Sequence, residues 1–343
     1  MNLNNSFSVI IVTWNALHHL KTFLPSVVHS NYPNFEVILA NNASDDGSAD
    51  WVRDTYPSCK IVTYDNNYGY ARGNNMAVKY AENEILVFLN NDVKTDPDWL
   101  SELDKAFQVE NTDIVQPKIL SYEKPRFFEY AGASGGMIDR LGYPFCRGRI
   151  FDHLEKDEGQ YDEQLPIFWA SGAAFAIRKD LFLHSGGFDE EFEFHMEEID
   201  LCWRCLKMGA NVSVQPSSVV YHLGGGSLSA DSSKKTYYNY RNSLLMLVKN
   251  LDRFIFSKIF IRLLLDGVAG IRELLLGKPK NTFAIVAAHF SFYGRLGAYI
   301  RIRKEMKNKF TIKTPGQLVY PRLIVFDYFI RKRKRYSDLE GLK

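Results

Sequence analysis

Cysteine is scarce in this chain, with 4 residues among 343, and the spacing offers no disulfide framework. We therefore expect a reducing compartment. Cys202 and Cys205 form a CxxC pair, but no second pair and no nearby histidine complete a zinc site. We interpret this pair as one buried face of a helix; the other two cysteines are Cys59 and Cys146.

Long apolar segments are also missing. No stretch reaches about 18 uncharged apolar residues, the minimum for a membrane-spanning helix. The first apolar run, residues 9–12, is too short for the core of a signal peptide. The composition, 46% hydrophobic and 24% charged, is that of a globular protein, and the length suits about two domains.

The net charge of +2 conceals a division of charge along the chain. Residues 1–235 carry 20 Lys and Arg against 33 Asp and Glu, a net charge of −13. Residues 236–343 carry 22 against 7, a net charge of +15. Such an asymmetry indicates a basic region with an anionic partner, either nucleic acid or a membrane surface. We place a domain boundary between residues 235 and 236.

Apolar runs alternate with helical patterns over the first hundred residues. The runs at 8–12, 35–40, 60–64 and 85–89 are rich in Val, Ile and Phe, as β-strands are. Segments with apolar residues at helical spacing, such as residues 18–30, lie between them. The alternation predicts an α/β fold with a doubly wound, mostly parallel sheet and helices on both faces.

Every one of these strands runs into Asn, Asp, Thr or Gly, so one edge of the predicted sheet is polar. Ligands of open α/β sheets collect at the carboxyl ends of the strands. The fourth strand leads into Asn90-Asn91-Asp92, and a carboxylate flanked by amides suits a hard cation that bridges phosphates. The same residue types are favoured in plain turns, so this stretch alone leaves both interpretations open.

The order and spacing of several short motifs make the sequence resemble a family 2 glycosyltransferase of the GT-A fold, an inverting enzyme that uses a nucleotide-sugar. The chain most resembles the branch that includes rhamnosyltransferases of bacterial surface polysaccharide synthesis, and its insertion at residues 142–162 has the look of that branch. The resemblance covers residues 6–245 and is carried by residues 9–15, 41–48, 67–70, 74–75, 89–93, 169–173, 186–190, 197–201 and 222–227.

The resemblance implies a nucleotide-sugar site at the strand exits. Thr13 and Asn15 at the first exit, and Asn41 with Asn42 at the second, would contact the base and the ribose. The family usually has Asp where Asn41 stands, but an amide can still pair with a pyrimidine. Arg72 is expected on the ribose or phosphates, although a solvated Arg at a helix start fits as well. The remaining expected donor contacts are Asn75 and Asn91.

A divalent cation, Mg²⁺ or Mn²⁺, is also implied. The family's DxD-like motif is reduced here to Asn90-Asn91-Asp92, so Asp92 would hold the cation against both phosphates. Asn90 in place of a first Asp weakens binding by the protein alone, so the metal would arrive with the donor. His222 is the expected second ligand; its alternative role is a hydrogen-bonded histidine of the core.

The family places a catalytic base in the motif at residues 197–201, and Glu198 occupies that position, one methylene longer than the usual Asp. The crowded carboxylates should raise the pKa of at least one of them. An ordinary acidic first turn of a helix is the alternative. The acceptor and sugar pocket is expected to include Trp169, which would stack on a sugar unless it is simply core, together with Gly172, Ala173, Glu197 and Asp200.

The last hundred residues show apolar positions at helical spacing with basic residues between them, ending in Arg331-Lys332-Arg333-Lys334-Arg335. Basic amphipathic helices fit a protein on an anionic leaflet. Nucleic-acid binding would explain the charge but leaves the acidic first part without a purpose, so we expect no nucleic acid. We expect a helical, membrane-associating region at residues 236–343, at the cytoplasmic face of the cell membrane.

Together these features predict transfer of a sugar, with dTDP-rhamnose or a UDP-sugar as the favoured donor, to a lipid-linked saccharide. A non-catalytic nucleotide- or sugar-binding scaffold is the alternative, because Asn41, Asn90 and Glu198 all depart from the commonest family pattern. A nucleotidyltransferase shares the sheet architecture, but that class has a Gly-rich, basic loop after its first strand, and residues 13–17 form no such loop.

Overall fold

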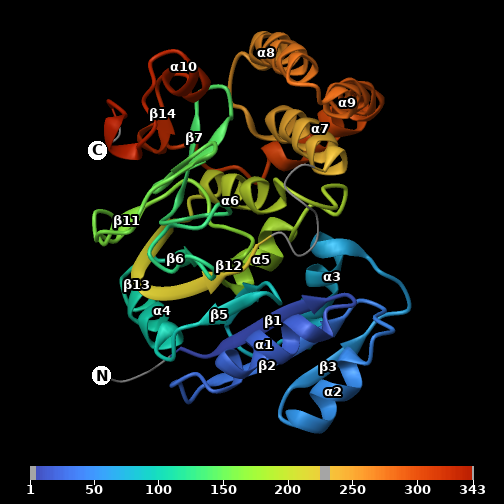
Figure 1. The fold of residues 1–343 in the computed structure, drawn as a ribbon, viewed down its shortest axis with the longest axis vertical. Coiled ribbons are helices and arrows are strands. Elements are labelled where there is room, and N and C mark those ends of the chain that lie inside the picture. The colour runs from blue at the N-terminus through green and yellow to red at the C-terminus, as the bar shows by residue number, and fades with distance from the viewer. Residues whose placement is uncertain (1–4, 225–231, 342–343) are drawn as a thin grey trace.

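The computed structural model describes residues 5–224 and 232–341 of the chain. Residues 225–227, the end of the last predicted motif, therefore lie outside the described residues. A large curled sheet with helices on both faces forms one part of the molecule, and a smaller sheet and a group of helices lie beyond it (Figure 1). The predicted α/β architecture with a helical C-terminal region is confirmed.

Among the described residues, nine strands form the large sheet, in the order β11-β13-β6-β12-β4-β1-β2-β3, with β5 paired to β13. β3, β2, β1 and β4 are parallel, so their carboxyl ends meet at one edge. β12 runs antiparallel between β4 and β6, so the second half of the sheet is mixed. The strands are β1 Phe7–Thr13, β2 Phe35–Asn41, β3 Lys60–Thr63, β4 Ile85–Leu89, β5 Val93–Thr95, β6 Ile114–Ser121, β11 Leu165–Pro166, β12 Ala174–Arg178 and β13 Val212–His222.

Strand β4 shows why helices cover both faces. Leu86 and Phe88 belong to one buried cluster, with side chains of α3, α5 and α6, whereas the alternate residues Ile85, Val87 and Leu89 belong to another, with side chains of α1 and α4. A strand whose two faces are both apolar must be covered on both. The helices are α1 Leu17–Val28, α2 Ser48–Thr55, α3 Gly69–Ala77, α4 Trp99–Phe107, α5 Lys179–Ser185 and α6 Glu197–Lys207.

The insertion at residues 142–162 contributes to a second sheet, in the order β10-β9-β8-β7-β14. Lys118 of β6 anchors it, because its buried ammonium lies 2.9 Å from the Asp157 carboxylate and also pairs with Asp162. The sequence did not predict this sheet, since strands of two to four residues show no periodicity. Its strands are β7 Gly136–Asp139, β8 Pro144–Cys146, β9 Arg149–Ile150, β10 His153–Leu154 and β14 Val319–Tyr320.

The C-terminal segment completes this second sheet. β14 pairs with β7 in parallel register, and the Ile324 N–H donates to the Asp139 carboxylate over 3.0 Å. The Tyr336 N–H donates to the Glu155 carboxylate over 3.1 Å. The short helix α10, Ile324–Phe329, follows β14. The end of the chain is therefore bonded to the insertion rather than to the neighbouring C-terminal helices alone.

Helices α7 (Ser233–Asn250), α8 (Ile255–Leu275) and α9 (Pro279–Lys307) lie together at one end of the molecule (Figure 1). All residues of α7 from Arg241 to Asn250 are buried. One hydrophobic cluster joins α7 and parts of α8 and α9 to the first sheet. The boundary between residues 235 and 236 stays a prediction, and the packing across it is continuous.

Helix α8 has two charged residues on its inner face. Arg262 and Asp266 are buried; Arg262 donates to the Leu141 carbonyl (2.9 Å), and Asp266 lies 3.3 Å from His289. Large apolar side chains occupy the outer face of α8 and continue onto α9, and they are exposed. They are Phe256, Phe260, Leu264, Val268, Ile271 and Leu275 on α8, and Phe283, Val286, Phe290 and Tyr293 on α9. We call these ten residues the apolar stripe.

No helix among the described residues has the length and apolar content to pass through a bilayer. Cys202 and Cys205 are free and fully buried on α6, which confirms the interpretation of the CxxC pair as a helix face.

A buried charge cluster joins α6 to α7. Asp200, fully buried, accepts hydrogen bonds from Arg204 (2.8 Å), Lys249 (2.9 Å) and Asn250 (2.7 Å). Burial raises the pKa of Asp200, but Lys249 and Arg204 outweigh this and hold it below its usual value. Arg204 also donates to the carbonyls of Ser185 and Gly187, so the cluster fixes the loop before α6.

Asp200→Asn should lower the free energy of unfolding by about 3–5 kcal/mol, because it leaves the buried Arg204 without a carboxylate. Chemical denaturation measures the loss. Asp50→Asn, which removes an exposed carboxylate paired with Arg53, is the control and should change stability by about 0.5 kcal/mol or less. Equal stability of the two variants would show that the cluster is not a main support of the fold.

Candidate active site

The polar strand exits meet as the sequence predicts, because β4, β1 and β2 are neighbours in the sheet. Asn91, after β4, donates from its side-chain amide to the Thr13 hydroxyl at the end of β1 over 3.2 Å. The Asn42 N–H, after β2, donates to the Thr13 carbonyl over 2.8 Å. Three exits thus form one continuous polar edge.

Asn15 and Asn41 shape the first part of this edge. Asn15 has a left-handed backbone (φ 47°), which Asn tolerates better than most residues. Its side-chain oxygen accepts from the Asp45 N–H (2.9 Å), and the Asn41 side-chain oxygen accepts from the Ser44 N–H (3.1 Å). The side-chain amide of Asn41 remains for a base, as its predicted role requires.

The helix α2 starts without a capping side chain. Neither Ser44 nor Asp45 caps the helix; the capping position is Gly47, with a left-handed backbone. Asp46 instead accepts from the Ser48 N–H (3.0 Å) and from the Leu17 N–H (2.8 Å). Asp46 therefore links the starts of two helices.

Asn42 and Asn75 use their amides inside the protein. Asn42 donates to Asn67 (2.8 Å) and accepts from the Tyr68 N–H (2.8 Å), which holds the turn before α3. Asn75 donates to the Phe188 carbonyl and accepts from its N–H, both over 2.9 Å. The structure thus shows these two residues as supports of loops; a direct contact with a nucleotide stays a prediction.

Arg72 lies at the solvent-exposed margin of the candidate site. Its guanidinium carbon is 4.2 Å from the centre of the Tyr68 ring, and its Nε is 3.7 Å from the Glu190 carboxylate. About half of the side chain is exposed, so both roles foreseen for it remain compatible with its position.

Asp92 and His222 lie together, as predicted from distant parts of the chain. Asp92 Oδ1 is 3.2 Å from His222 Nε2, and both side chains are buried. The other ring nitrogen, Nδ1, lies 3.3 Å from the carboxylate of Glu129, which the sequence analysis missed. Burial lowers the pKa of His222, but Asp92 and Glu129 on its two sides raise it to about 10. Burial raises the pKa of Asp92, but His222 outweighs this and lowers it.

These residues fit a small divalent cation, which would displace the proton that Asp92 and Glu129 otherwise hold on the His222 ring. Bonds of about 2.1 Å at right angles place two ligand atoms about 3.0 Å apart, close to the separation of Asp92 Oδ1 and His222 Nε2. A carboxylate behind the histidine, here Glu129, is the usual support of a metal-binding imidazole. Within the described ranges no group of three or more His, Cys, Asp and Glu is arranged as a metal site. A cation would therefore take its remaining ligands from phosphates and water, as Mg²⁺ often does.

Glu197 and Glu198 begin helix α6, after two consecutive residues with left-handed backbone, His195 (φ 66°) and Met196 (φ 73°). Asn242 of α7 fixes this strained turn by donating to the carbonyls of Phe194 and His195. Burial raises the pKa of Glu198 to about 7. Burial and the charge of Glu198 raise the pKa of Glu197 well above its usual value.

Gly172 faces this carboxylate pair, as predicted. A β-carbon at Gly172 would lie 3.4 Å from the Tyr70 hydroxyl and 3.8 Å from the Glu198 β-carbon. The Tyr70 hydroxyl donates to the Gly172 carbonyl over 2.7 Å. Ala173 is buried, and its carbonyl accepts from the Asn90 N–H (2.9 Å), so it supports the Asn90–Asp92 turn from behind.

The structure corrects the expected sugar contacts of Trp169 and Asp200. Trp169 is 2% exposed, packs on Gly136 and donates to the Met137 carbonyl over 2.8 Å, so it belongs to the core between the two sheets. Both oxygens of Asp200 are bonded within the α6–α7 cluster, so none is left for an acceptor.

Buried polar atoms without a hydrogen-bond partner gather in this region, among the residues that the structure describes. They include one carboxylate oxygen each of Glu197 and Glu198, His195 Nε2 and Arg149 Nε. Folded proteins rarely leave such atoms unpaired, and those that remain are often functional. No motif of the sequence pointed to Glu129, which reaches the site only through the fold, and Tyr70 lies in the motif at residues 67–70 but had no role assigned to it.

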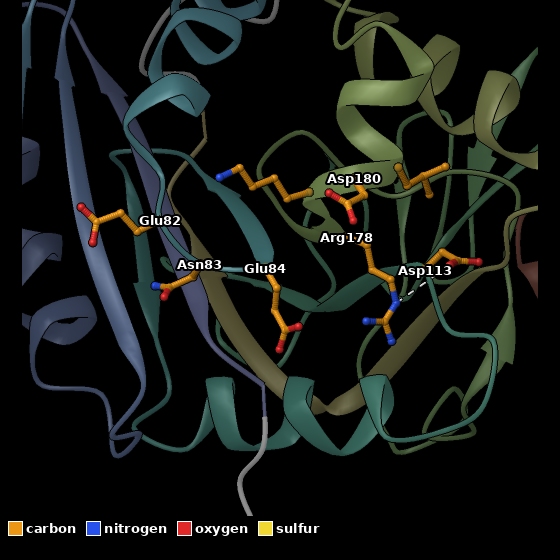
Figure 2. Close-up of a pocket in the computed structure, with 8 residues that line it drawn as sticks. Glu82, Asn83, Glu84, Asp113, Arg178 and Asp180 are labelled. Carbon is orange, nitrogen blue, oxygen red and sulfur yellow. Dashed lines mark ion pairs between the residues drawn. The ribbon is translucent and has the colours of Figure 1, made fainter.

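A cavity of about 450 Å³ lies at the opposite edge of the sheet, where β4 and β6 begin (Figure 2). Four of its side chains are acidic: Glu82, Glu84, Asp113 and Asp180. The cations there bond within the protein, since Arg178 lies 4.0 Å from Asp113 and Lys179 donates to the Ala81 carbonyl. An acidic cavity away from the strand exits does not suit an anionic nucleotide.

Residues 8–184 match the family described as glycosyl transferase family 2. The chain is 31% identical over 243 residues, 67% of its length, to the O-antigen biosynthesis protein RfbC of Myxococcus xanthus, but spans only 18% of that protein. It is 27% identical over 258 residues to the N-acetylglucosaminyl-diphospho-decaprenol L-rhamnosyltransferase of Mycobacterium tuberculosis, covering 70% of this chain and 83% of that protein.

The fold is similar to that of GalNAc-T7 in a crystal structure with UDP, GalNAc and Mn²⁺, with a TM-score of 0.57 and 15% identity over 73% of this chain and 48% of that one. The family match and the similarity in fold are both consistent with the polar edge at the strand exits. The chain belongs to glycosyl transferase family 2, as a rhamnosyltransferase-like glycosyltransferase of the GT-A fold.

Proposed function

We propose that the chain transfers a sugar from a nucleotide-sugar to a hydroxyl of a lipid-linked saccharide, with inversion at the anomeric carbon. The favoured donor is dTDP-rhamnose or a UDP-sugar. The observation that carries the proposal is the partnerless carboxylate oxygens of Glu197 and Glu198 in the same site as the Asp92–His222 pair. The sequence similarity to a rhamnosyltransferase and the similarity in fold to a protein crystallised with UDP support it.

On the donor side, Thr13, Asn15, Asn41 and Asn91 present hydroxyl and amide groups along the polar edge for the base and ribose. Asp92 and His222 would hold Mg²⁺ or Mn²⁺, and the structural neighbour with UDP also contains Mn²⁺. When bound, such a cation neutralises the charge of the departing diphosphate.

On the acceptor side, Glu198 is the base. It takes the proton of the acceptor hydroxyl as that oxygen bonds to the anomeric carbon and the bond from this carbon to the donor phosphate breaks. A single displacement of this kind inverts the configuration. Burial keeps the pKa of Glu198 high enough to make it an effective base near neutral pH.

The apolar stripe of α8 and α9 would lie on the membrane that carries the acceptor. Phe256, Phe290 and Leu275 are 80%, 75% and 83% exposed, which is unusual for large apolar side chains of a protein surrounded by water. Exposed basic residues, including Arg253, Lys280 and Arg301, lie on the same helices or next to them and suit anionic lipids at the cytoplasmic face.

Glu198→Gln should lower kcat by about 10²–10⁴-fold and leave the affinity for the nucleotide unchanged. For the wild type, kcat/KM should rise with pH up to about 7 and then level off, because only the ionised carboxylate accepts a proton. The titratable side chains that interact electrostatically with Glu198 are Glu197, Tyr70, Cys146 and Cys202. Initial rates across pH 5–9 measure both effects.

As a control for this base assignment, Glu193→Gln removes an exposed carboxylate that accepts from the Tyr238 hydroxyl and should keep the wild-type rate. A Glu198→Gln enzyme with wild-type kcat would exclude Glu198 as the base.

Asp92→Asn should abolish the Mn²⁺-dependent rise in melting temperature caused by nucleoside diphosphates. Glu129→Gln should weaken Mn²⁺ binding by about 10–100-fold, because the carboxylate that orients His222 is lost. A thermal-shift panel of UDP, dTDP and GDP with and without Mn²⁺ measures the first effect, and calorimetric titration with Mn²⁺ the second. Asp98→Asn, an exposed carboxylate, is the control. Mn²⁺-dependent stabilisation that survives in Asp92→Asn would refute the metal assignment.

The triple variant Phe260→Ser, Leu264→Ser, Phe290→Ser should bind vesicles of anionic phospholipid at least tenfold more weakly than the wild type, because each exposed apolar side chain contributes on entering the bilayer. Co-sedimentation with phosphatidylglycerol vesicles measures the binding. Leu183→Ser, which removes a 56%-exposed leucine of α5, is the control. Unchanged binding by the triple variant would show that the stripe does not contact lipid.

A further inference from the structure

Two cations near the Asp92–His222 pair have no role in the mechanism described above. Arg149 of β9 and Lys235 in the first turn of α7 both approach the ring of Tyr130, with the Arg149 guanidinium carbon 4.3 Å and the Lys235 ammonium 5.4 Å from its centre. Tyr130 follows Glu129, which contacts His222. The two cations therefore lie next to the Asp92–His222 pair, although they come from distant parts of the chain.

Arg149 is buried and forms no ion pair with a carboxylate among the described residues. Burial lowers its pKa, but Cys146, Tyr130 and, to a smaller extent, Glu129 outweigh this and raise it. Its side chain is 9% exposed, its Nη2 contacts only the Cys146 sulfur (3.5 Å), and its Nε has no partner in the described part of the chain. Buried cations normally have a carboxylate partner. Arg204 and Arg262 follow that rule with Asp200 and Asp266, whereas the buried Arg147 and Arg241 form no ion pair but donate to carbonyl or amide oxygens. Arg149 differs from both groups, because no oxygen accepts from its guanidinium among the described residues.

Lys235 is only partly buried, and it also lacks an ion pair with a carboxylate among the described residues. Burial lowers its pKa, with Glu129 acting against that shift and Arg149 adding to it. Lys235 stands at the amino end of α7, an 18-residue helix with no acidic side chain in its first turn. The N–H groups and dipole of a helix amino end also attract anions.

We propose that Arg149, Lys235 and the amino end of α7 bind a phosphate group of a diphosphate ester. The inference rests on the proposed function, in which both the donor and the lipid-linked acceptor carry such groups. Phosphate matches this set of groups, because a guanidinium offers a planar pair of donors and an ammonium offers a point charge. A bound phosphate would supply the ion pair that Arg149 lacks and would give its Nε an acceptor.

Calorimetric titration of the full chain with inorganic pyrophosphate in EDTA tests the site without any metal. We expect Arg149→Gln and Lys235→Gln each to weaken binding by about tenfold or more. Lys234→Gln is the matched control: the adjacent lysine lies over the rings of Phe194 and Tyr238 instead, and its variant should bind as the wild type does. No binding by the wild type, or equal affinity in all four proteins, would overturn the proposal.

Because EDTA removes the metal, this outcome is independent of Asp92 and of catalysis, so the phosphate site can fail while the proposed function stands. Thermal denaturation separates binding from folding. The melting temperature of Arg149→Gln without ligand should not fall, because a buried, unpaired charge is removed. A marked fall together with unchanged pyrophosphate affinity would identify Arg149 as a structural residue and overturn the proposal.

The same titrations with UDP or dTDP, and with farnesyl diphosphate, distinguish the source of the phosphate. Loss of affinity in the two variants for the nucleoside diphosphates alone assigns the site to the donor. Loss for farnesyl diphosphate alone assigns it to the lipid-linked acceptor. Unchanged affinity of both variants for every one of these compounds would overturn the proposal.

Discussion

The buried charge cluster around Asp200 is the constraint on which the site depends. Its partners come from α6 and α7, and Arg204 extends the cluster to the carbonyls of the loop after α5. A buried carboxylate with all its oxygens occupied tolerates little displacement, because any shift leaves a charge unpaired in a medium of low dielectric constant. The start of α6, with Glu197 and Glu198, is thereby held against the polar edge of the sheet. The base that we propose, Glu198, is thus positioned by contacts to α7, a helix that follows the first sheet in the chain.

The charged groups of the site form three sets, which differ in whether a group of opposite charge lies beside them. Asp92 and His222 compensate one another, and Glu129 stands behind the imidazole. Glu197 and Glu198 repel one another and favour the protonated form. Arg149 and Lys235 are cations without carboxylate partners in the described structure. A protein selected only for stability would pair the second and third sets with each other. Because the carboxylates and the cations are not paired with each other, the carboxylates would remain available to accept a proton from a ligand, and the cations to bind an anionic group of one.

The sequence predicts the elements with strong periodicity and the residues that follow them. The parallel strands and the meeting of their exits could be foreseen, because strand order in doubly wound sheets obeys general rules. The approach of His222 to Asp92 was expected only from the family resemblance. Trp169 could not be placed from its motif, since an aromatic residue beside glycines suits both a sugar wall and a core, and only the packing against Gly136 decides. Glu129 was out of reach because its partner, His222, is far away in sequence. The second sheet was missed because its strands are too short to show a pattern.

The last strand of the chain, β14, is bonded to β7, more than 170 residues earlier. The hairpin that carries Arg149 is therefore part of a sheet that stays incomplete until residues 319 and 320 have left the ribosome. Contacts over such distances close late in folding, because the entropy lost in closing the loop must be recovered afterwards. The donor side, formed by strands close in sequence, can assemble while synthesis continues. A growing chain would thus form the polar edge of its first strands before β14 pairs with β7, and the second sheet would be completed later than the first four strands.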